Sequence, residues 1–156
     1  MSDHSEISAA EASELELART IALQAHLGQS DKAGHPYIEH CERVASRVQD
    51  TKEKTVAFLH DLLEKCHGWD IDRLRQLGFS NDVVDAVDAL TRRRGEADDQ
   101  FVIRAIANKL ACPVKVADLE DNLRQANASG SDAGKYKRGL EVAAMVHADP
   151  DFRRLT

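Results

Sequence analysis

The sequence predicts an all-α protein, folded as one domain from a bundle of about eight helices. The chain has 156 residues, which is the size of a single domain. Only 4% of the residues are aromatic, whereas strands are usually rich in aromatic and β-branched residues. Apolar residues recur at intervals of three and four along most of the chain, and no segment alternates apolar and polar residues as a half-buried strand does.

The first two helices are predicted from their capping residues and helix breakers. We expect residues 1–8 to form a polar, flexible N-terminus. A first helix follows, in which Ser8 and Glu11 have the spacing of a capping box. This helix should end near Gly28, and a second should begin at Pro36, because proline is tolerated in the first turn of a helix.

A third helix is predicted to run to about Cys66, with Thr51 as its N-cap. Its middle, residues 56–63, is apolar nearly all round. A helix with that pattern lies at the centre of a bundle, because it has neighbours on every side. Asp70 and Gly78 then fit the start and the end of a short fourth helix.

The second half of the chain continues the helical pattern. Ser80 is expected to cap a fifth helix, and a solvent-exposed turn at 92–96 leads into a sixth at about 99–108. A seventh helix is predicted over 113–126, and a Gly/Ser-rich loop at 129–134 precedes the last one. No linker divides the chain, so the sequence predicts one domain.

Composition also narrows the possible functions and locations. The formal net charge is −6, which argues against nucleic-acid binding, although a local basic patch could still bind a small anion. No apolar run is long enough to span a membrane, and the N-terminus lacks the apolar core of a signal peptide. The three cysteines follow no disulfide or zinc-site spacing. We therefore expect a cytoplasmic protein that contacts neither membrane nor nucleic acid.

Two groups of polar residues interrupt the apolar pattern. His60 and Asp61 stand in the middle of the apolar helix, where an aspartate is rarely buried unless it is paired or coordinated. Asp118 and Asn122 share one side of the seventh helix. A divalent cation would account for a buried acid, and mixed His and Asp ligands suit Mn²⁺, Fe²⁺ or Zn²⁺. The alternative is that Asp61 forms an ion pair with Lys65 and that His60 is a core histidine. For an isolated His-Asp dipeptide this alternative is the more common one.

Four segments, in this order and spacing, resemble the hydrolase domain of the RelA/SpoT homologue family, which belongs to the HD phosphohydrolase superfamily. They are residues 25–40, 58–64, 87–92 and 114–122. That family cleaves the alarmone (p)ppGpp at its 3′-pyrophosphate. The resemblance implies an HD-type helical bundle over residues 9–156 and a metal-dependent phosphohydrolase that acts on a nucleotide phosphate or pyrophosphate ester.

The resemblance also implies roles for individual residues. It gives the chain four metal ligands, for which Mn²⁺ is the family's usual ion: His40, His60, Asp61 and Asp118. Glu64 matches the acid that helps to activate the attacking water. Three further residues match positions that contact a nucleotide or phosphate: Lys32, Arg92 and Asn122.

Two positions depart from the family pattern. Asp31 stands where the family has an arginine that stacks on the guanine base, and Lys65 stands where it has a second acid. An anion in place of a stacking cation should weaken base binding and repel phosphate. We therefore expect weak (p)ppGpp hydrolysis and better turnover of another nucleotide. The alternatives are a metal-binding regulatory module with weakened catalysis and a helical interaction protein without metal.

Overall fold

The structure, a computed structural model, describes the backbone of residues 2–149 and the side chains of residues 9–149. Over that backbone the chain forms nine helices: α1 (Ser2–Ala25), α2 (Tyr37–Ser46), α3 (Thr51–Leu59), α4 (Leu62–Lys65), α5 (Ile71–Gln76), α6 (Asn81–Ala89), α7 (Asp98–Ala107), α8 (Ala111–Ser129) and α9 (Gly134–Ala148). The only β pairing in this part of the chain is an isolated bridge between Ser30 and Pro36. The all-α prediction is therefore confirmed.

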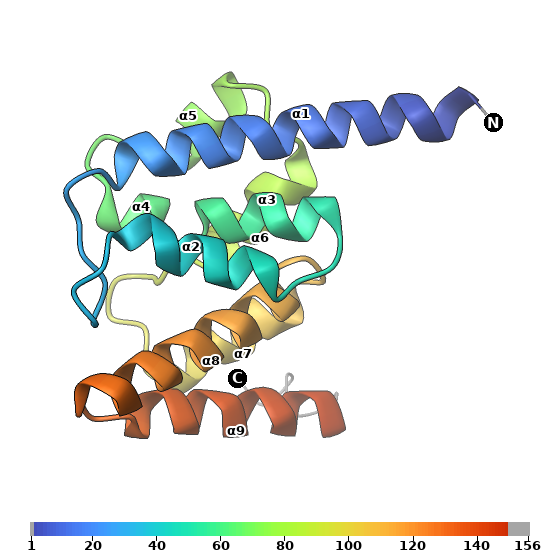
Figure 1. Cartoon of the computed structure of the whole chain (residues 1–156). Helices are drawn as coiled ribbons and strands as arrows, with labels where there is room; N and C mark the ends of the chain where they lie inside the picture. The colour runs from blue at the N-terminus through green and yellow to red at the C-terminus, as the bar shows by residue number, and fades with distance from the viewer. Residues whose placement is uncertain (1, 150–156) are drawn as a thin grey trace.

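The helices stack in layers, as Figure 1 shows. The long helix α1 lies on α3, and α2 packs beside α3 in the next layer. Helix α8 crosses below α2 and α3, and α9 covers α7 and α8 at the far side. No helix in the described part is both long and apolar enough to cross a membrane.

The predictions for the two ends of the chain can be compared with the structure only in part. Helix α1 begins at Ser2, before the expected capping box at Ser8, because residues 2–25 contain no glycine or proline to stop it. The side chains of residues 1–8 and all of residues 150–156 lie outside the described part. The division into a flexible N-terminus and a domain over 9–156 stays a prediction.

The predicted third helix is wrong as a single element, because the chain turns at His60 and Asp61 between α3 and α4. Asp61 leaves the helical region, with φ −105° and ψ 2°. Its carboxylate accepts a hydrogen bond from the Tyr37 hydroxyl and lies 2.9 Å from His60 Nε2. These tertiary contacts override the helical preference of the apolar run. The start also differs, since Asp50 caps α3, not Thr51.

Two hydrophobic clusters hold the layers together. The larger one joins α1, α2, α3, α6 and the first part of α8. A smaller one lies between α7 and α9 and consists of Val102, Ile103, Ile106, Val142, Ala143 and Val146. Helix α8 runs between the two clusters, so its side chains can meet groups from both halves of the molecule.

Candidate metal centre

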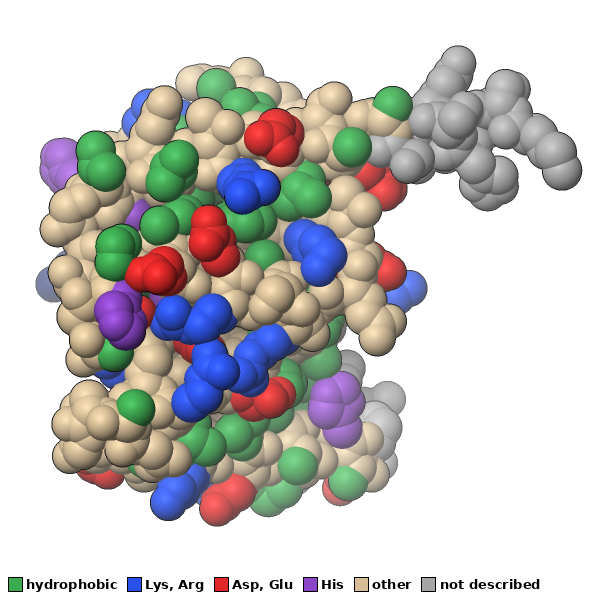
Figure 2. All heavy atoms as spheres, in the orientation of Figure 1, with side chains coloured by type: hydrophobic (Ala, Val, Ile, Leu, Met, Phe, Trp, Pro, Cys, Tyr) green, Lys and Arg blue, Asp and Glu red, His purple; other side chains and the backbone are tan. Residues whose placement is uncertain are grey.

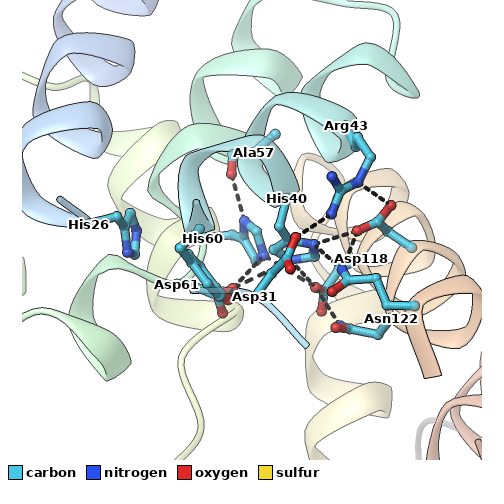
Figure 3. Close-up of polar contacts among 12 residues, drawn as sticks. His26, Asp31, His40, Arg43, Ala57, His60, Asp61, Asp118 and Asn122 are labelled. Carbon is cyan, nitrogen blue, oxygen red and sulfur yellow. Dashed lines mark hydrogen bonds and ion pairs between the residues drawn. The ribbon is translucent and has the colours of Figure 1, made fainter. Parts of the chain in front are cut away.

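Four polar side chains converge where α2, the α3–α4 turn and α8 meet. They are His40 from α2, His60 and Asp61 from the turn, and Asp118 from α8. Each offers one donor atom, and these four atoms all lie within 4.8 Å of one another. Figure 3 shows the side chains pointing toward a common point. The arrangement could hold a metal ion.

The imidazole Nε2 atoms of both histidines face the carboxylates. His40 Nε2 lies 3.1 Å from Asp118 Oδ1 and 3.6 Å from Asp61 Oδ2. His60 Nε2 lies 2.9 Å from Asp61 Oδ2 and 3.2 Å from Asp118 Oδ1. The break after α3 brings His60 and Asp61 together, although neighbouring residues of a regular helix point about 100° apart.

The other ring nitrogen of each histidine is held by an acceptor. His40 Nδ1 lies 2.7 Å from Asp121 Oδ2, and His60 Nδ1 lies 2.6 Å from the carbonyl oxygen of Ala57. A carbonyl or an ionised carboxylate can only accept, so Nδ1 donates in both cases. Nε2 is therefore the nitrogen available to a metal on each ring, as is usual for metal-binding histidines with a hydrogen-bonded partner.

The charges of the cluster perturb its own pKa values. Burial lowers the pKa of His40, but hydrogen bonds with Asp118, Asp121 and Asp61 outweigh it and raise that pKa to about 11. Burial also lowers the pKa of His60, and the charges of Asp61 and Asp118 raise it to about 10. Burial raises the pKa of Asp61 and Asp118, but the charge of His60 brings both well below the usual range. A divalent cation would satisfy these carboxylates in place of the two imidazole protons.

The cluster opens into a cavity of about 270 Å³. His60, Asp61 and Asp118 form part of its floor, and Glu64 and Tyr136 also line it. Six basic side chains contribute to the walls: Lys32, Lys65, Arg92, Lys115, Lys135 and Arg138. Five acids line it too: Asp61, Glu64, Asp98, Asp99 and Asp118. Two of the cations are paired with them, Arg92 with Asp98 at 2.8 Å and Arg138 with Asp99 at 3.1 Å. The basic side chains could still favour an anionic ligand.

The structure brings the expected catalytic and substrate residues to this cavity. The backbone N–H of Arg92 donates to Glu64 Oε1 at 2.7 Å, so Glu64 has one fixed oxygen. Lys32 Nζ donates to Asn122 Oδ1 at 3.1 Å, and Asn122 Nδ2 donates to Asp118 Oδ1 at 2.9 Å. Lys32, Glu64, Arg92 and Asn122 come from four separate parts of the sequence and line the same space.

The two departures from the family pattern lie in different places. Asp31 is buried and does not line the cavity, because its carboxylate pairs with Arg43 at 2.9 Å. The expected repulsion between Asp31 and a substrate phosphate therefore does not follow. Lys65 does line the cavity, and its ammonium lies 5.2 Å from the centre of the Tyr37 ring. Its expected alternative partner, Asp61, is bonded to the Tyr37 hydroxyl instead.

Three polar residues near the cluster were not identified from the sequence: Tyr37, Lys115 and Asp121. Lys115 is buried, with Nζ 3.5 Å from Asp118 Oδ2. Asp121 is fully buried against His40. A signal existed for Asp121, because Ala117, Asp121 and Gln125 recur every four residues on one helix face and all are buried.

The basic side chains that join α2 to α8 face outward from the cluster. Arg43 Nε donates to Asp121 Oδ1 at 2.8 Å, and Arg47 lies 3.3 Å from Glu120. Figure 2 shows Lys and Arg side chains gathered over this part of the surface. These pairs fix the crossing of the two helices that carry His40 and Asp118.

Known proteins resemble this chain in sequence and in fold. No family model matches it. The guanosine-3′,5′-bis(diphosphate) 3′-pyrophosphohydrolase of Vibrio cholerae serotype O1 is 28% identical to it over 141 residues, covering 81% of this chain and 20% of the relative. A solved structure of a metazoan ortholog of SpoT, a protein described as hydrolysing ppGpp with a role in starvation responses, superimposes with a TM-score of 0.67. It is 21% identical, and the match covers 85% of this chain and 83% of that chain.

These comparisons confirm the resemblance that the motifs predicted and establish the fold as the one of the solved structure. The chain spans about a fifth of the length of the curated relative, since the match covers 20% of it.

Proposed function

We propose that the chain is a metal-dependent phosphohydrolase that acts on a nucleotide phosphate or pyrophosphate ester, with chemistry like that of a (p)ppGpp 3′-pyrophosphohydrolase. The observation that carries the proposal is the convergence of His40, His60, Asp61 and Asp118 beside a cavity that His60, Asp61 and Asp118 line together with several basic side chains. The named activities of the similar proteins support the same reaction class.

The metal in this proposal is held by those four side chains. Two imidazole nitrogens and two carboxylate oxygens suit Mn²⁺, the ion that the resemblance implies, and are compatible with Fe²⁺ or Zn²⁺. A divalent cation in such a site supplies Lewis acidity and lowers the pKa of a water molecule that it binds. Tyr37 and Lys115 hold the two carboxylates in place by their contacts with Asp61 and Asp118.

Glu64 is the proposed general base. Its Oε1 is occupied by the Arg92 backbone N–H, so Oε2 is left to accept a proton from the attacking water. The basic wall residues bind the phosphate groups and offset the negative charge that develops during their hydrolysis. Lys65 follows Glu64 in the chain and lines the cavity. It places a cation where the RelA/SpoT homologue family has a second acid.

The nucleotide is proposed to lie toward α9. Lys32 Nζ donates to Asn122 and lies 5.0 Å from the centre of the Tyr136 ring. Tyr136 offers an aromatic face for a base, because any nucleobase can stack on one. Asp31 cannot contribute there, so the substrate loses the base contact that an arginine gives in the alarmone hydrolases. The proposal includes a cytoplasmic location, which suits three cysteines whose spacing matches no disulfide framework.

The test is a panel of phosphorylated nucleotides, with (p)ppGpp first, assayed with added Mn²⁺ after metal analysis of protein purified without chelators. Asp61→Ala should lose both metal and turnover. Glu64→Gln should keep the metal and lose turnover by about 10²–10⁴-fold. Glu42→Gln, the same change at an exposed position of α2, is the matched control.

Each other result has a defined meaning. Bound metal without turnover of any substrate would favour the regulatory module over the enzyme. Absence of both metal and turnover would favour an interaction protein. Full activity in Glu64→Gln would assign the general base to another residue. The highest kcat/KM on (p)ppGpp would contradict the expectation of a different preferred nucleotide.

A further inference from the structure

A continuous set of charged contacts runs from the loop before α2 to the metal cluster. Asp31 Oδ2 accepts from Arg43 Nη2 at 2.9 Å, and Arg43 Nε donates to Asp121 Oδ1 at 2.8 Å. The other oxygen of Asp121 accepts from His40 Nδ1 at 2.7 Å. Figure 3 shows the Arg43 side chain directed toward Asp31, with His40 nearby. These contacts link residues 31, 43, 121 and 40 in series.

The two acids of this series are buried, and their oxygens are occupied. The side chain of Asp31 is 1% exposed and that of Asp121 is 0% exposed. Asp121 also accepts from Arg124 at 2.7 Å and from Gln125 at 2.6 Å. A buried carboxylate with a donor at every side has one orientation, because any rotation would leave charged groups unpaired.

Asp31 contributes a second constraint through its own loop. Its Oδ1 accepts from the backbone N–H groups of Ala33 and His35, both at 3.0 Å. Gln125 Oε1 accepts from the backbone N–H of Lys32 at 3.1 Å. The loop is therefore folded around the Asp31 carboxylate and joined to α8 as well as to α2. The Arg43 fork is held at one end by this loop and at the other by Asp121.

We infer that Asp31 and Arg43 are positioning residues, which act through Asp121 to hold the His40 ring with Nε2 turned to the metal. The inference rests on the proposed metal centre. It gives the acid at position 31 a role inside the protein, in place of the substrate contact made there by an arginine in the resembling family. It also makes Arg43 a residue that serves the centre without touching it.

The first experiment measures metal affinity, which is a readout separate from turnover. Metal-free wild type, Asp121→Asn, Arg43→Lys and Asp31→Asn are titrated with Co²⁺ and Mn²⁺, and the visible absorption of bound Co²⁺ reports its ligand geometry. Asp121→Asn should weaken binding by about 10–100-fold, as is typical for the partner of a metal-binding histidine. Asp31→Asn and Arg43→Lys should weaken it by at least about threefold and change the Co²⁺ spectrum, because they act at one step removed.

A double-mutant cycle then tests whether the contacts act in series. If Asp31 acts through Asp121, Asp31→Asn should have little further effect on metal affinity in an Asp121→Asn background. The matched control is Asp82→Asn. Asp82 lies on α6, away from the four cluster residues, and pairs with Lys52 at 2.6 Å. The metal affinity of this variant should stay within about twofold of wild type.

A purely structural role gives a different pattern. In that case Asp31→Asn would lower the melting temperature but leave the metal Kd and the Co²⁺ spectrum of the folded protein unchanged, which overturns the inference. Fully additive effects in the cycle would overturn it as well. If Asp31→Asn does not fold, Arg43→Lys decides, since it keeps the charge and loses the fork. Failure of wild type to bind either ion would refute the metal centre itself, and the inference with it.

Discussion

Metal binding at pH 8 should release about two protons from the protein. In the metal-free state the pKa of His40 is about 11 and that of His60 about 10, so both rings are protonated at this pH. The carboxylates carry no proton to lose, because the pKa values of Asp61 and Asp118 lie well below their usual range. Each ring must give up its Nε2 proton to coordinate the metal, so two rings release about two protons.

Isothermal titration calorimetry with Mn²⁺ in buffers of different ionisation enthalpy measures this number directly. The apparent association constant should rise by about two log units per pH unit between pH 7 and pH 9, and level off above the two pKa values. His60→Gln should release only about one proton. Release of less than one proton by wild type would refute the assignment that both rings are protonated before the metal binds and coordinate it afterwards.

The same two pKa values set the sign of the pH dependence of stability in the metal-free protein. Both are raised above the ordinary value of 6.5. Their contribution is therefore fully present below pH 6.5 and is lost as the pH rises toward 10 and 11. Urea unfolding of metal-free protein should show lower stability at pH 9 than at pH 6.5, and added metal should reverse the difference.

Three further predictions concern other parts of the molecule. Hydrogen bonds with Arg104 lower the pKa of Glu96 to about 2. Its contribution to folding stability is therefore present above about pH 4.5 and is lost as the pH falls through 2. Glu96→Gln should lower the free energy of unfolding in urea by about 1–2 kcal/mol at pH 7 and by almost nothing near pH 2. A Cβ at Gly139 would lie 2.7 Å from Leu119 Cδ2, so Gly139→Val should destabilise the fold by about 1–3 kcal/mol, whereas Ala144→Val on the exposed side of α9 should not; equal melting temperatures would contradict this packing. Lys65→Asp should raise kcat/KM for (p)ppGpp by about tenfold or more relative to other nucleotides, and an unchanged ratio would show that position 65 does not select the substrate.

The sequence predicted the helices well where local signals decide their ends. Asp70 is the N-cap of α5 and accepts from the Arg73 N–H, and Gly78 follows that helix with a positive φ of 92°. The break at His60 and Asp61 was missed because it depends on contacts with α2 and α8. No local rule separates this apolar run from an unbroken helix.

The residues of the candidate site could be predicted from the sequence, but their contacts could not. The four cluster residues, Glu64 and the substrate residues came from matching motifs. The structure brings the four cluster residues together, and all of the set except His40 line one cavity. The orientation of Asp31 could not be predicted, because it depends on Arg43, twelve residues further along the chain. Asp121 resembles an exposed helix acid when only its neighbours Glu120 and Asn122 are considered.

The two hydrophobic clusters have a consequence for how such a protein can diverge. The segments that carry the four cluster residues, α2, the α3–α4 turn and α8, pack through the larger cluster. Helix α9 packs on α7 through the smaller cluster and on α8 where Gly139 meets Leu119. Lys135, Tyr136 and Arg138 project into the cavity from α9. Under the proposed function, substitutions at these three positions are expected to alter which molecule is accepted without moving the four cluster residues. We therefore expect that similar chains with the same four cluster residues need not share a substrate.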